Sequence, residues 1–80
     1  MSGARLFVSF PEEIVDRPLL YEIVKKFDVV PNVRRANVEE RTGWLILELH
    51  GDQGRLDAAI SYLEDSGCTV NRMEGDVLEG

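Results

Sequence analysis

The stretch VVPNVRRANVEERTGWLILELHG (residues 29–51) decides the fold of this 80-residue chain. Its second half, 44–50, alternates leucine with other residues, a pattern typical of a strand that buries one face. The leucines of this face are Leu45, Leu47 and Leu49. A turn at Thr42-Gly43 separates this strand from a more polar strand predicted over 32–41. The stretch is therefore predicted to form a β-hairpin.

The first strand of this hairpin has an irregular pattern of apolar residues. Val33 and Val38 lie an odd number of residues apart, so in a regular strand they would point to opposite faces. Both can face the core only across a β-bulge, which places two residues opposite one on the neighbouring strand. We expect this bulge near residues 34–36.

The segment before the hairpin is predicted to form a strand and an amphipathic helix. Residues 4–10 alternate in polarity as a strand does, and Pro11 ends the pattern. Residues 17–28 carry apolar side chains at helical spacing. Asp16 is the expected N-cap of this helix, and Pro18 is tolerated in its first turn because the missing N–H costs nothing there.

A second helix and a short strand are predicted after the hairpin. Asp52 is the expected N-cap, and Gly67 lies where a helix commonly ends on glycine. The apolar positions between them have helical spacing: Leu56, Ala59, Ile60 and Leu63. Residues 68–73 are predicted to form the last strand. We expect one domain over residues 1–74 and an acidic, frayed tail over 75–80.

The predicted order is strand, helix, strand, strand, helix, strand. With right-handed crossovers this order gives an α+β, ferredoxin-like βαββαβ sandwich, in which a four-stranded antiparallel sheet carries both helices on one face. The other face of the sheet is then uncovered. If the hairpin leucines face the helices, Trp44 and Ile46 point to the uncovered face, and Phe7 of the first strand joins them. We interpret Phe7, Trp44 and Ile46 as a contact surface rather than as scattered apolar residues.

Composition narrows the classes of function. A net charge of −6 repels phosphate backbones, and Arg34-Arg35 is the only basic pair on the strands, so no nucleic-acid partner is expected. A single cysteine excludes an internal disulfide and fits a reducing compartment. The chain starts without a signal-peptide pattern and has no apolar run long enough to span a membrane. We expect a cytoplasmic protein without membrane insertion.

The residues that usually perform catalysis are scarce. His50 is the only histidine, so no histidine pair exists for a metal, and its ordinary interpretation is a solvated strand end. Cys68 has no cysteine or histidine partner nearby in sequence. Neighbouring acidic residues point apart on a strand or spread around a helix, so they indicate solvated charge rather than acid–base pairs. We expect no enzymatic activity, no cofactor and no metal.

The joint order of several short motifs resembles the NIL domain family. The matching features are "FP" at the end of the first strand, Pro18, Asn32-Val33, Gly43, "LELHG", Ala59, Leu63 and Gly67. The likeness covers nearly the whole chain. It implies a ferredoxin-like, ACT-like module of the kind attached to the ATPase subunits of methionine importers, found also beside ferredoxin-type domains and as short free proteins of sulfur amino-acid metabolism.

The resemblance also implies methionine binding near the Asn-Ile-Leu motif that names the family, at the interface of two paired domains. The candidate ligand-binding residues are Asn32, Val33, Arg34 and Asn37. Asn32 can donate and accept hydrogen bonds. Arg34 departs from the family pattern, which has leucine there; it removes an apolar wall that a thioether would contact, yet its guanidinium can pair with a carboxylate.

Two functions remain open from the sequence. The first is a small-ligand-binding regulatory module, paired as a homodimer, that senses a sulfur amino acid such as methionine. The second is a ligand-free adaptor that uses the Phe7, Trp44 and Ile46 face to dock onto itself or onto a partner in sulfur metabolism. The resemblance implies a transporter ATPase or a ferredoxin as such a partner.

Overall fold

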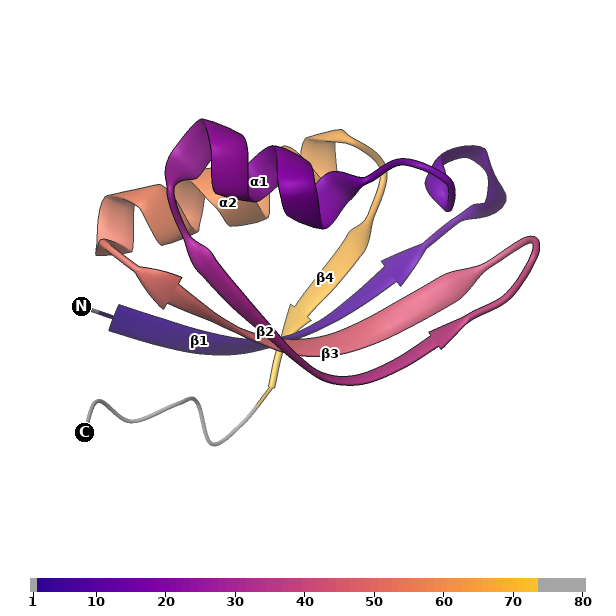
Figure 1. Ribbon diagram of the computed structural model, residues 1–80, viewed down its shortest axis with the longest axis horizontal. Coiled ribbons are helices and arrows are strands. Elements are labelled where there is room, and N and C mark those ends of the chain that lie inside the picture. The colour runs from indigo at the N-terminus through magenta and orange to yellow at the C-terminus, as the bar shows by residue number, and fades with distance from the viewer. Residues whose placement is uncertain (1, 74–80) are drawn as a thin grey trace.

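The computed structural model describes residues 2–73, and the predicted order of strands and helices is confirmed (Figure 1). One additional element, a short 3-10 helix, follows the first strand. The elements are β1 (Ser2–Phe10), η1 (Glu12–Ile14), α1 (Leu19–Phe27), β2 (Val30–Val38), β3 (Gly43–Gly51), α2 (Gln53–Asp65) and β4 (Thr69–Arg72). The predicted acidic tail over 75–80 lies outside the described residues.

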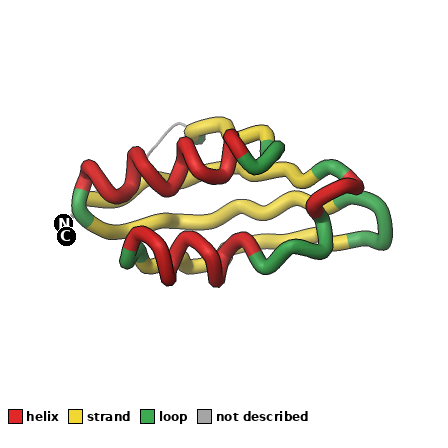
Figure 2. The backbone as a smooth tube through the Cα atoms, turned by 90° about the horizontal axis from the view of Figure 1, so that it is seen from above, coloured by secondary structure: helices red, strands yellow, loops and turns green. Residues whose placement is uncertain are grey.

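The four strands form one antiparallel sheet in the order β2-β3-β1-β4. Both helices lie on the same face of this sheet, and the opposite face is open (Figure 1). Seen from above, α1 runs on the β2 side of the sheet and α2 on the β4 side (Figure 2). The molecule is therefore an α+β, ferredoxin-like sandwich, as predicted.

A single apolar core fills the space between the sheet and the helices. The three hairpin leucines are buried, and Leu47 and Leu49 are fully inaccessible to solvent. Their fully buried neighbours come from β1 and from both helices: Leu6, Val8, Leu19, Ile23, Leu56 and Leu63. Burial of one such side chain stabilises the fold by about 1.5–3 kcal/mol. Alternation on β1 and β3 thus fixes which face of the sheet points to the helices.

The predicted bulge exists. The register between β2 and β3 shifts between Val33 and Arg35, with Arg34 as the additional residue. Because of this shift Val33 lies opposite the buried Leu47 and Val38 lies opposite Gly43, so both valines are on the helix side. Neither valine is buried, however, because β2 is an edge strand and α1 covers little of it.

Two predicted boundaries are wrong. The helix expected from residue 17 begins at Leu19, with Pro18 rather than Asp16 at the N-cap position. The intervening residues are instead held by the turns around η1, where the Arg17 N–H donates to the Ile14 carbonyl. The strand expected over 32–41 is shifted to Val30–Val38, because residues 39–42 close the hairpin turn through a backbone bond from Glu39 N–H to the Thr42 carbonyl.

The second helix is bounded as expected. Asp52 is its N-cap residue, although its side chain makes no capping hydrogen bond. Gly67 has φ of 115°, a left-handed conformation that suits glycine and that turns the chain from α2 into β4.

Candidate functional site

The open face of the sheet carries an aromatic pair at its centre. Phe7 on β1 and Trp44 on β3 stack with ring centroids 5.5 Å apart and an interplanar angle of 20°. Phe7 lies directly opposite Ile46 in the strand register. The structure therefore brings together the three side chains predicted to share this face, and all three are half-buried rather than fully exposed.

A carboxylate lies beside this apolar centre. Arg5 Nη2 donates a hydrogen bond of 2.9 Å to Glu48 Oε2, and His50 Nε2 lies 3.8 Å from Glu48 Oε1. The hydrogen bond from Arg5, more than any other contact, lowers the pKa of Glu48 below its ordinary value of 4.5. Glu48 is thus an ionised, partly buried acceptor at neutral pH.

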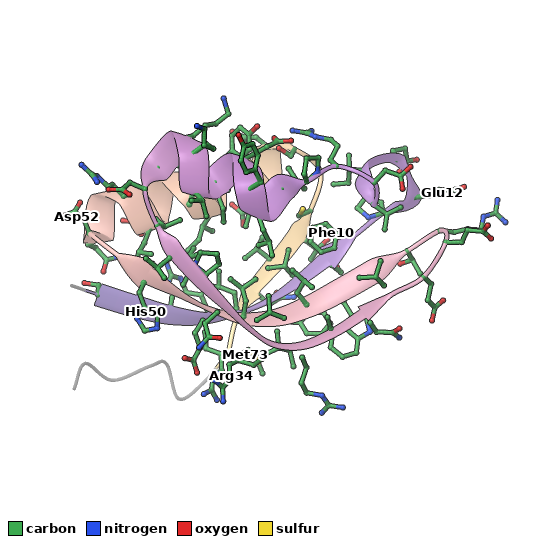
Figure 3. The ribbon with its side chains drawn as sticks, in the orientation of Figure 1. Phe10, Glu12, Arg34, His50, Asp52 and Met73 are labelled. Atoms are coloured by element: carbon green, nitrogen blue, oxygen red, sulfur yellow. The ribbon has the colours of Figure 1, made fainter. Side chains whose placement is uncertain are left out.

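The four candidate ligand-binding residues do not form one cluster. Asn32 lies opposite Glu48 and Asn37 opposite Trp44, so both are on the open face, near opposite ends of β2. Arg34 also points away from the helices (Figure 3). Val33 lies on the helix side instead and is 43% exposed. Strand alternation separates Val33 from Asn32 and Arg34, and the bulge places Asn37 on the open face as well.

A groove lies on the helix side of the sheet, near the end of β2 that contains Val38. The sequence did not indicate it. The groove has a volume of about 300 Å³ and is lined almost entirely by apolar side chains. The main wall residues come from four elements or their flanks: Phe10, Val15, Pro18, Leu20, Val38 and Leu45. Phe10 and Glu12 mark this end of the molecule in Figure 3.

A polar network holds one wall of the groove. Arg17 Nη2 donates to Glu22 Oε1 at 2.7 Å and to the Tyr62 hydroxyl at 3.3 Å, and the Tyr62 hydroxyl in turn donates to Glu22. The hydrogen bond from Arg17 is the main reason that the pKa of Glu22 is lowered, and the bond to Glu22 raises the pKa of Tyr62. This network ties the segment before α1 to α2, so that wall of the groove is preformed.

The exposed large apolar side chains of the described residues gather on one side of the molecule. All of them belong to α1 or to the neighbouring β2: Tyr21, Val24, Val30, Val33 and Val38. Every residue of β2 except Pro31 is exposed, and the outer edge of the strand has no neighbouring strand in the described part of the chain. On the helix side, this edge and α1 form a second apolar surface, whereas Val30, which lies opposite His50, belongs to the open face.

The described residues offer little for catalysis. Cys68 is buried, and desolvation raises the pKa of its thiol to about 11, so the reactive thiolate is scarce at neutral pH. Residues 2–73 contain no group of three or more side chains placed to hold a metal ion. No helix within them has the length and apolar character needed to cross a membrane.

Fold and surfaces together define a small α+β domain with an apolar groove and a free edge strand. The family model of the NIL domain matches residues 4–72, and the chain belongs to this family. Methionine import ATP-binding protein MetN 1 of Listeria monocytogenes serotype 4b (strain F2365) is 31% identical over 77 residues. The match covers 91% of this chain but only 23% of that protein.

Other relatives agree on the family and the fold. A MetN 1 protein of Salmonella choleraesuis (strain SC-B67) is 34% identical over 69 residues, which cover 81% of this chain and 20% of the relative. Among solved structures, the C-terminal domain of an ABC transporter ATP-binding protein from Enterococcus faecalis superposes with a TM-score of 0.81 at 20% identity, covering 92% of this chain and 87% of that one. The chain thus spans about a quarter of the curated relatives and nearly all of this solved domain.

Proposed function

We propose that this chain is a regulatory module that binds a sulfur amino acid such as methionine, acts as a dimer and catalyses no reaction. Membership in the NIL family, whose relatives include methionine import ATP-binding proteins, supports a methionine-related regulatory role. The observation that carries the proposal is the apolar groove between β2 and the start of α1.

The groove suits the side chain of methionine. Its volume of about 300 Å³ is at the small end of ligand pockets, which suits a single amino acid. Its walls are aliphatic and aromatic, and a thioether makes favourable contacts with both kinds of side chain. The guanidinium of Arg17 is already engaged with Glu22, so the groove itself supplies few groups for the polar end of an amino acid.

A second copy completes the groove in this proposal. The free edge of β2 can pair with the same edge of another copy, and a twofold axis makes two such strands antiparallel. The beginning of one strand then runs beside the end of the other, which contains Val38 and lines the groove, and Val33 is the side chain of that beginning on the helix side, whereas Asn32 points to the open face. Ligand and dimer are thereby coupled, because the ligand contacts both copies.

Calorimetric titration with methionine, homocysteine and cysteine tests the proposal. We expect saturable binding of methionine that is weakened about fivefold by Val38→Ala, since this exposed side chain lines the groove and its apolar contact with a ligand contributes roughly 1 kcal/mol. Asn71→Ala on β4, at the other edge of the sheet, is the matched control and leaves binding unchanged. Absence of heat with all three amino acids contradicts ligand sensing.

The stacked aromatic pair favours a second candidate function, a ligand-free adaptor that docks through Phe7, Trp44 and Ile46. An open sheet face that presents a tryptophan is typical of the apolar centre of an interface. Candidate partners are a transporter ATPase subunit or a ferredoxin. Trp44 is the only tryptophan, so its emission reports contact directly. Emission that none of these partners changes contradicts the adaptor.

A further inference from the structure

Two adjacent arginines share the open face because of the bulge in β2. Arg35 lies opposite Ile46, whose side chain is on the open face, and Arg34 is the additional residue of the bulge. Arg34 also points away from the helices in Figure 3, and its charge contributes to the lowered pKa of Glu48. Without the bulge, neighbouring residues would point to opposite faces. The bulge therefore places two positive charges side by side on the open face, where a regular strand would place one.

These two arginines differ from the others in their partners. Each of the other arginines forms an ion pair within the described residues: Arg5 with Glu48, Arg17 with Glu22, Arg41 with Glu12, Arg55 with Asp28 and Arg72 with Asp57. Arg34 and Arg35 contact no carboxylate of residues 2–73, although the whole chain has a net charge of −6. Two exposed cations that pair with no described carboxylate are available to bind an anion.

The rest of the open face has the composition of an interface. Glu48 is the only acidic residue that the strand register places on this face, and Arg5 already holds it. The half-buried Trp44 and Ile46 lie on β3, directly beside the bulged strand. Arginines next to an apolar, aromatic centre are enriched in protein–protein interfaces.

We propose that the open face binds a short acidic segment of a partner protein, whose carboxylates pair with Arg34 and Arg35 while an apolar side chain packs on Trp44 and Ile46. A guanidinium binds a carboxylate through two parallel hydrogen bonds, which fixes the orientation of the segment. The net charge of −6 opposes any anion, so a short segment with few carboxylates is repelled less than a polyphosphate. Phe7 and Trp44 also stack on one another, which leaves fewer ring faces for bases. The proposal names the partner chemistry of the adaptor function and does not depend on the groove.

The test uses a synthetic acidic peptide and the emission of Trp44. The probe is the hexapeptide Asp-Leu-Glu-Asp-Leu-Glu, and its matched control has Asn and Gln in place of the acids. Titrations run at low ionic strength, about 50 mM, where surface charges are weakly screened. The double variant Arg34→Ser/Arg35→Ser is compared with Arg41→Ser/Arg55→Ser, which removes the same charge from the hairpin turn and from α2.

We expect the acidic peptide to change Trp44 emission and to bind about fivefold to tenfold more weakly to Arg34→Ser/Arg35→Ser. The control double variant is expected to change affinity less than twofold, and the uncharged peptide to bind at least fivefold more weakly. An equal loss of peptide affinity in both double variants overturns the proposal, because the effect would then come from the change in net charge and not from Arg34 and Arg35. Equal binding of the uncharged peptide overturns it as well, while leaving an apolar adaptor surface intact.

Other occupants are distinguished in the same assay. Tighter binding of a ten-nucleotide single-stranded DNA than of the acidic peptide overturns the proposal in favour of nucleic acid. Binding seen only after removal of residues 74–80, which carry Glu74, Asp76 and Glu79, overturns it in favour of the chain's own acidic segment. A change in Trp44 emission on self-association that is lost only in Arg34→Ser/Arg35→Ser assigns the face to a second copy and likewise overturns it.

Discussion

Replacing Val38 by aspartate separates ligand binding from folding. Val38 lines the groove yet is 65% exposed, because it lies on the edge strand β2. An exposed position tolerates substitution, so Val38→Asp is expected to change the free energy of unfolding by no more than about 0.5 kcal/mol. A ligand in the groove covers the exposed part of this side chain, which is about two thirds of it. Complete burial of a valine contributes about 1.5–3 kcal/mol, so this contact contributes roughly 1–2 kcal/mol to binding.

Aspartate removes that contribution and also places a carboxylate against an apolar ligand. Loss of the apolar contact alone weakens binding about fivefold to thirtyfold. Desolvation of the new carboxylate increases the loss, so methionine affinity in Val38→Asp is expected to fall more than tenfold by calorimetry. Asn71→Asp adds the same charge to the opposite edge strand β4 and is the control. Unchanged affinity in Val38→Asp, together with an unchanged urea midpoint, refutes the assignment of the groove.

Further predictions concern the core, the open face and the thiol. Leu47→Ala removes a fully buried side chain of a central strand and is expected to lower the free energy of unfolding by about 2–5 kcal/mol in urea titration; a loss below 1 kcal/mol contradicts the packing. The pKa of Glu48 is lower in the folded state than its ordinary 4.5, so the stability it contributes is present above pH 4.5 and is lost as pH falls through the folded pKa. Glu48→Gln is therefore expected to flatten the acid limb of the stability curve, and an unaltered limb argues against the Arg5 bond. Burial raises the pKa of Cys68 to about 11, so iodoacetamide is expected to modify this thiol at pH 8 only after unfolding; rapid native labelling disagrees with the burial.

The features of the fold that depend on the alternation of apolar residues along a strand could be predicted from the sequence. The alternation of leucines in β3 predicted its approximate extent and its buried face. This worked because β3 is a central strand with one face packed against the helices. The opposite parity of Val33 and Val38 predicted the bulge, which the register confirms between Val33 and Arg35. The start of α1 was predicted less well. The helix begins at Leu19, because backbone hydrogen bonds of the η1 region form in place of the expected Asp16 cap.

The surfaces depended on tertiary arrangement, which no local pattern encodes. Phe7, Trp44 and Ile46 share a face as predicted, since strand parity and the order of the central strands determine it. The groove was not predicted, because its walls come from β1, from α1 and the segment before it, and from β2 and β3. The exposure of Val38 likewise reflects the position of β2 at the sheet edge rather than any property of its sequence. Strand order therefore decides which apolar residues form the core and which stay exposed.

Sedimentation equilibrium tests whether ligand binding and dimerisation are coupled as proposed. A concentration series is recorded with and without millimolar methionine. A ligand that contacts both copies favours association by linkage, so the dimer dissociation constant is expected to fall when methionine is present. Val38→Asp, which perturbs the groove at the edge of β2, is expected to abolish this response. A dissociation constant that methionine leaves unchanged, or a monomer under both conditions, contradicts the account.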